Sequence, residues 1–60
     1  MKITFWKRGD IYGLMNKTVL EEYTMKTRIR NEKVIADIIP NYQKDEYYHL
    51  DLNEYILEVE

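Results

Sequence analysis

The fold is decided by the stretch from Tyr23 to Pro40, which reads YTMKTRIRNEKVIADIIP. From Tyr23 to Arg30 apolar and polar side chains alternate, which is typical of a strand with one buried face. Asn31 and Glu32 interrupt the pattern before a second β-prone run begins. Because asparagine tolerates the left-handed conformation that tight hairpin turns need, we predict a two-residue turn at 31–32 with a hairpin around it.

This turn fixes the register of the hairpin. It gathers the apolar and small side chains of both strands on one face, namely Met25, Thr27, Ile29, Val34, Ala36 and Ile38. A slip of one residue would turn this face away from the core, so we predict that it is buried. On the opposite face Lys26 falls opposite Asp37, which predicts a cross-strand ion pair. Pro40 has no backbone donor and is expected to end the ladder.

The carboxy-terminal residues repeat this device. Apolar side chains alternate with polar ones on both sides of Asn53 and Glu54, at Tyr48, Leu50, Leu52, Tyr55, Leu57 and Val59. A turn at 53–54 predicts a second hairpin, in which His49 lies opposite Glu58.

The amino-terminal residues contain a third turn signal. Gly9 followed by Asp10 suits a hairpin turn between residues 2–8 and 11–15. In that hairpin Trp6 would lie across Gly13, since glycine leaves room for a large neighbour. Both faces carry apolar side chains, which indicates burial by the core on one side and by a partner on the other.

Residues 18–24 fit two structures. Thr18 and Glu21 form a capping box, which is typical of a short helix, whereas Thr24 and Thr27 argue against a long helix and favour a strand. The segment 41–46 is predicted to be a loop. The expected fold is therefore a single domain over residues 1–60. It is all-β, with five or six antiparallel strands in meander order as a small sheet or barrel, and with at most one short helix near 18–24.

The size of the chain limits how it is stabilised. Sixty residues lie close to the lower limit for folding alone. The chain has no cysteine and His49 is its single histidine, so neither a disulfide nor a usual four-ligand zinc site is expected. Self-association is the remaining common source of stability, and we predict a homodimer.

The start of the chain and its apolar runs bear on location. The residues that follow Met1 lack the continuous apolar run of a signal peptide, and no run approaches the roughly 18 apolar residues of a membrane helix. The expectation is a cytoplasmic protein without a membrane contact. Abundant isoleucine, lysine, glutamate, tyrosine and asparagine indicate an AT-rich genome, such as that of a phage or another mobile element, and would place the protein in the host cytoplasm.

Catalysis has little support in the sequence. The chain has no cysteine and no serine, and its single histidine leaves one ordinary candidate for a general base. The carboxylates match no calcium-loop spacing, and Gly9 and Gly13 form no phosphate-binding motif. The expectation is a protein that is not an enzyme and that has no cofactor.

Protein binding fits the composition better. Six tyrosines and one tryptophan exceed what a small core accommodates, and both residue types are favoured anchors of interfaces. Residues 1–30 carry a formal charge of +4 and residues 31–60 one of −6. An acidic surface could engage a basic partner, for example a host nucleic-acid enzyme or defence protein that the chain inhibits by stoichiometric binding. The predicted partner-binding residues are Trp6, Tyr47, Tyr48, Asp51, Glu54 and Glu58.

The alternative is a module that binds single-stranded nucleic acid. Basic residues next to aromatic ones could contact phosphates and stack on bases. The predicted residues of that face are Lys7, Arg8, Lys26, Arg28 and Arg30. A sequence pI of about 5.3 weighs against this alternative, because nucleic-acid-binding domains are usually basic.

Overall fold

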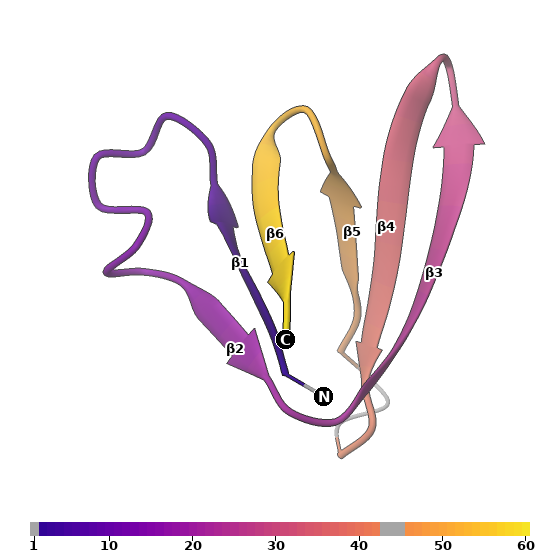
Figure 1. The fold of residues 1–60 in the computed structure, drawn as a ribbon. Helices are drawn as coiled ribbons and strands as arrows, with labels where there is room; N and C mark the ends of the chain where they lie inside the picture. Colours follow the sequence, from indigo (N-terminus) through magenta and orange to yellow (C-terminus); the bar gives the residue numbers. More distant parts are fainter. Residues whose placement is uncertain (1, 43–45) are drawn as a thin grey trace.

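A computed structural model describes residues 2–42 and 46–60 and shows six strands in this part of the chain (Figure 1). The strands are β1 (Ile3–Lys7), β2 (Thr18–Leu20), β3 (Tyr23–Arg30), β4 (Lys33–Pro40), β5 (Tyr48–Asp51) and β6 (Tyr55–Val59). The all-β prediction is confirmed. The alternative of a short helix near 18–24 is wrong, because this segment forms β2, a bend at 21–22 and the start of β3. Of the loop expected over 41–46, residues 43–45 lie outside the described residues.

The strands form two antiparallel sheets of three strands each. One sheet has the order β2-β1-β6 and the other the order β3-β4-β5. The second sheet is the meander that the sequence predicts, while the last strand of the chain returns to pair with the first. The bend at 21–22 and the turn after β5 each carry the chain from one sheet to the other.

The core lies between the two sheets. Ile3 and Phe5 of β1 and Leu20 of β2 meet Ala36 and Ile38 of β4 and Leu50 of β5. Each sheet has one apolar face, and the two apolar faces pack against each other. This packing removes both faces from water, which neither sheet could do alone. Within the described residues, no helix is present that could cross a membrane.

The β3–β4 hairpin has the predicted register. Met25 lies opposite Ile38 and Ile29 opposite Val34, and the strands are joined at 31–32. The backbone φ angles of Asn31 and Glu32 are 52° and 64°, which is the left-handed pair that a two-residue hairpin turn of this kind needs.

The tip of this hairpin departs from the prediction. Ile38 is fully buried and Met25 is partly buried, but Ile29 is 78% exposed and Val34 is 44% exposed. Thr27 is exposed as well. The reason is length, because β3 and β4 have eight residues each and the strands of the facing sheet have three to five. The far end of the hairpin therefore extends beyond the core that it was expected to cover.

The predicted carboxy-terminal hairpin is wrong. β5 pairs with β4 and β6 pairs with β1, so the turn at 52–54 connects two sheets instead of two paired strands. The backbone N–H of Glu54 donates to the carbonyl of Asp51 in this turn. As a consequence His49 lies opposite Asp37 of β4 and not opposite Glu58.

The predicted amino-terminal hairpin is also wrong. Residues 8–17 form a loop, and the edge of β1 that residues 11–15 were expected to occupy is paired with β2. The apolar side chains of 11–15 do not alternate cleanly, so they offer no single face to the core. Gly9 does adopt a left-handed φ of 81° in the turn that follows β1.

Candidate functional site

The loop at residues 8–17, called here the β1–β2 loop, is folded into consecutive turns. The Asp10 carboxylate accepts a hydrogen bond from the Tyr12 backbone N–H at 2.8 Å. The Asp10 carbonyl accepts one from Gly13 at 2.9 Å, and the Tyr12 carbonyl accepts others from Met15 and Asn16 at 3.0 and 2.9 Å. These bonds give the loop a defined path without a strand ladder.

This loop carries four exposed large apolar side chains, called here the loop crest: Ile11, Tyr12, Leu14 and Met15. Ile11 is 87% exposed and Met15 is 82% exposed, and Tyr12 and Leu14 between them are exposed too. Single exposed apolar residues are normal on a protein surface, but several in one short segment are typical of an interaction site. None of these four side chains takes part in the core.

Gly13 holds the loop against the sheet. It is buried, and a Cβ atom built on it would lie 2.8 Å from Cδ1 of Trp6. The same atom would lie 3.1 Å from the carbonyl oxygens of Asp10 and Lys7. The contact between Trp6 and Gly13 that the sequence predicts is therefore present, although the strand pairing expected around it is not.

A small aromatic groove lies between the loop and the sheets. Its volume is about 220 Å³, and it is lined by Phe5, Trp6, Lys7, Asp10, Gly13, Asn16, Thr18, Tyr48, Leu50 and Tyr55. The rings of Phe5 and Tyr48 meet edge to face with centroids 5.1 Å apart. Burial raises the pKa of the Tyr48 hydroxyl, followed in importance by the nearby Glu46 carboxylate. The groove thus offers ring faces together with a few polar groups, which is the usual make-up of a binding pocket.

The outer face of the β3-β4-β5 sheet carries a different cluster. Arg28 Nε lies 2.7 Å from the Asp37 carboxylate, and the His49 ring contacts the same carboxylate. The Arg28 hydrogen bond, and next the one from His49, hold the pKa of Asp37 below its ordinary value. The predicted ion pair of Lys26 with Asp37 is therefore wrong. Lys26 is the direct cross-strand neighbour, but Arg28 reaches the carboxylate from the diagonal position.

The predicted partner-binding residues are divided among several surfaces. Trp6 and Tyr48 come together in the aromatic groove. Tyr47 packs edge to face on His49, with centroids 4.7 Å apart, and Asp51 lies 3.7 Å from Lys33. Glu54 lies in the turn before β6, and Glu58 lies exposed on β6 itself.

The predicted nucleic-acid residues are divided as well. Lys26, Arg28 and Arg30 alternate along β3 and share its outer face. Lys7 and Arg8 lie at the end of β1 in the other sheet, where the Arg8 backbone N–H donates to the Glu54 carbonyl at 2.7 Å.

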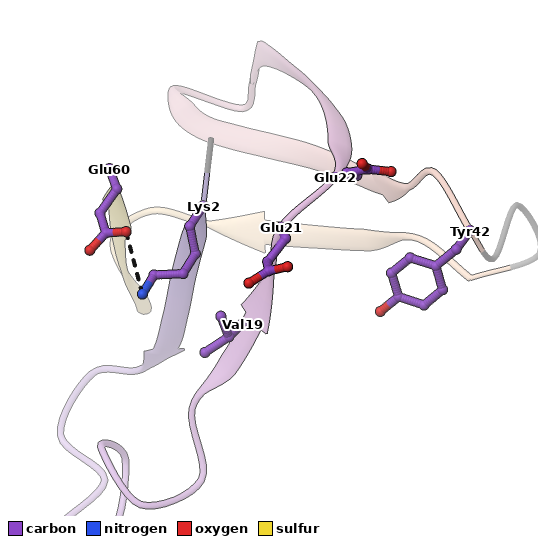
Figure 2. Close-up of a pocket in the computed structure, with 6 residues that line it drawn as sticks. All are labelled: Lys2, Val19, Glu21, Glu22, Tyr42 and Glu60. Atoms are coloured by element: carbon purple, nitrogen blue, oxygen red, sulfur yellow. Dashed lines mark ion pairs between the residues drawn. The ribbon is translucent and has the colours of Figure 1, made fainter.

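A wider hollow of about 730 Å³ lies near the two chain ends (Figure 2), which Figure 1 shows at the opposite end of the molecule from the tip of the β3–β4 hairpin. Its lining comes from the two chain ends, β2, the β2–β3 bend and the turn after β4, with Lys2, Val19, Glu21, Glu22, Tyr42 and Glu60. Lys2 Nζ lies 3.3 Å from the Glu60 carboxylate. Glu21, Glu22 and Glu60 thus bring three carboxylates to this hollow, and the predicted partner-binding residues Asp51, Glu54 and Glu58 do not line it.

The exposed side chains of the β1–β2 loop are not among the site residues predicted from the sequence. Their signal was present, because residues 11–15 are apolar on both faces of the strand that was expected there. A loop explains that pattern, since its side chains need not alternate.

No protein-family model, no curated protein and no solved structure matches the chain.

Proposed function

We propose that this protein is a non-enzymatic module that binds another protein through the β1–β2 loop and the adjacent aromatic groove. The observation that carries the proposal is the exposure of four large apolar side chains, Ile11, Tyr12, Leu14 and Met15, on one hydrogen-bonded loop. Their contact with water is unfavourable by roughly 25 cal/mol for each Å² of apolar surface, and a partner would remove it.

The construction of the loop supports binding. The turns at Asp10 and Tyr12 and the seat of Gly13 on Trp6 fix the loop before a partner arrives. A surface that is already ordered loses less conformational entropy on association than a mobile one does. The exposed side chains thus lie on a backbone that is prepared for contact.

The groove supplies a place for an anchoring side chain. Its volume of about 220 Å³ is suited to one or two side chains and not to a large ligand. Trp6, Tyr48 and Tyr55 provide aromatic surface, and Asp10 and Asn16 provide polar groups on the loop side. Buried aromatic pockets of this kind dominate the energy of many interfaces.

Single-stranded nucleic acid remains the second candidate ligand. The observation in its favour is the row of Lys26, Arg28 and Arg30 along the outer face of β3. Asp37 is paired with Arg28 among these cations, and Asp51 lies beside Lys33 on the same sheet. These carboxylates weaken the attraction for phosphate, so we favour protein as the ligand.

Affinity capture with two matched variants tests the proposal. Leu14→Asp/Met15→Asp alters the loop crest, and Tyr42→Asp/Tyr47→Asp alters two large exposed side chains elsewhere on the surface. In nuclease-treated lysate of the source organism, the wild type and the Tyr42/Tyr47 variant should retain the same protein partner, and the loop variant should lose it. Retention by the loop variant, or loss of all binding after nuclease treatment, would overturn the proposal.

Self-association is a further proposal for this small chain. The exposed loop crest provides an apolar surface on which a second copy could be seated. The melting temperature should then rise with protein concentration, and the loop variant should abolish the rise. A mass of 7.4 kDa by light scattering at micromolar concentration would count against a dimer.

A further inference from the structure

β3 is an edge strand with an open side. It pairs with β4 alone, and Figure 1 shows it at the outer end of its sheet. It has eight residues without a proline, and its register with β4 runs from Tyr23 to Arg30 without a bulge. Proline and bulges are common means of blocking an edge, so β3 lacks two of the usual protections against strand addition.

The hydrogen bonds of β4 identify which residues of β3 face outward. The Val34 carbonyl accepts from Leu52, so Val34 directs its backbone groups toward β5. The alternate residues of β4, from Lys33 to Ile39, then direct theirs toward β3. Their partners on β3 are Thr24, Lys26, Arg28 and Arg30. The backbone N–H and C=O groups of Tyr23, Met25, Thr27 and Ile29 therefore point to the open edge.

The side chains along this edge form two rows. Met25 and Ile29 lie on the face turned toward the core, where Met25 is partly buried and Ile29 is largely exposed. Lys26 and Arg30 lie on the outer face, and neither forms an ion pair within the described part of the chain. An added strand would meet apolar side chains on one face and cations on the other.

We propose that β3 is a docking edge for an extended acidic segment of a partner protein, which adds as a fourth strand to the β3-β4-β5 sheet. Apolar side chains of the segment would cover Met25 and Ile29, and its carboxylates would face Lys26 and Arg30. Main-chain hydrogen bonds to residues 25–29 provide affinity, and the alternation of apolar and acidic side chains provides selectivity. This surface is separate from the β1–β2 loop, so it does not rest on the function proposed above.

Charge argues against a second copy of β3 as the occupant. In an antiparallel pair of β3 strands centred on Thr27, Lys26 of each copy would lie opposite Arg28 of the other. Like charges directly opposite one another destabilise a strand pair.

Glu21 and Glu22 at the β2–β3 bend limit where the acidic side chains of the segment can lie, because they repel carboxylates at the Tyr23 end of β3. The acidic side chains should thus lie toward Arg30.

A capped hexapeptide of alternating glutamate and valine is the probe. Its binding to the full chain should slow hydrogen exchange at the amides of Met25, Thr27 and Ile29, while those of Lys26 and Arg28 are already protected by β4. The same peptide with lysine in place of glutamate should bind at least about tenfold more weakly. Protection that spreads over consecutive residues, or that does not alternate, would overturn strand addition.

Two variants separate backbone pairing from charge. Thr27→Pro removes a donor that points to the open edge and spares the β3–β4 ladder, so the chain should stay folded and lose the peptide by about tenfold or more. Lys26→Glu/Arg30→Glu keeps the backbone donors and should reverse the preference to the lysine peptide. Equal binding of both peptides by this double variant would contradict the proposal.

Edge protection that appears without peptide and grows with protein concentration would also contradict the proposal, because it would indicate that β3 pairs with β3 of a second copy. Tighter binding of an oligonucleotide than of the peptide, lost in the double variant but kept in Thr27→Pro, would assign the edge to nucleic acid instead.

Discussion

Trp6 and Gly13 are in direct contact, so close that a Cβ atom on Gly13 would stand 2.8 Å from Cδ1 of the indole. This contact connects the sheet to the loop that carries the exposed apolar crest. It also forms part of the wall of the aromatic groove, since both residues line it. The position of the proposed binding surface therefore depends on a residue without a side chain.

Replacing Gly13 tests this dependence. Gly13→Ala should lower the free energy of unfolding by about 1–3 kcal/mol, because the added methyl group overpacks a site closed by Trp6 and two backbone carbonyls. Gly9→Asn is the control, since nothing lies within 4 Å of a Cβ there and its cost should be confined to the strain of the left-handed φ, which asparagine tolerates better than most side chains. Urea unfolding followed by the emission of Trp6, the single tryptophan, measures both. Equal stability of Gly13→Ala and the wild type would show that the loop does not rest on Trp6.

Replacing one isoleucine by alanine on each strand of the β3–β4 hairpin tests where the core ends. Ile38 is fully buried, so Ile38→Ala should cost about 2–4 kcal/mol of stability as a large-to-small core change. Ile29 lies at the exposed end of β3, and Ile29→Ala should change stability by less than about 0.5 kcal/mol. Chemical denaturation gives both values, and similar costs for the two variants would mean that the hairpin tip is covered in solution.

The lowered pKa of Asp37 indicates that the stability of the folded state depends on pH. Its pKa is lowered by hydrogen bonds from Arg28 and then His49, so the folded state favours the ionised form. The resulting stability is present above the ordinary pKa of 3.8 and is lost as the pH falls through the lowered value. Asp37→Asn should therefore be less stable than the wild type at neutral pH and approach it at about pH 2. Thermal unfolding across this range measures the gap, and a gap that stays constant would contradict the assignment.

The sequence predicted the β3–β4 hairpin well because the information for it is local. The alternation of apolar residues and the turn at Asn31 and Glu32 together leave one register that gathers the apolar side chains on one face. The limit of burial at Ile29 was not predictable in this way, because it depends on the length of strands in the facing sheet.

The two terminal hairpins failed for a related reason. Tyr48 to Val59 has the alternation of a hairpin, but alternation does not identify the strand with which each half pairs. The apolar face of each sheet must be covered by the other sheet. This requirement involves residues far apart in the sequence, and it is met when β6 pairs with β1. For the candidate site, Trp6 and Tyr48 were identified from residue type, while the exposed loop crest required knowledge that residues 11–15 do not form a strand.

Site-specific photocrosslinking tests most directly whether the chain binds a protein through the β1–β2 loop. Tyr12 on the loop and Tyr47, which packs on His49 of the other sheet, are each 57% exposed, so they form a matched pair for replacement by the photoreactive analogue p-benzoylphenylalanine. Both variants are irradiated in nuclease-treated lysate of the source organism and compared by mass spectrometry. We predict one dominant protein adduct at position 12 and none of that mass at position 47. An adduct confined to position 47, or the same adduct in equal yield at both positions, would contradict binding through the β1–β2 loop.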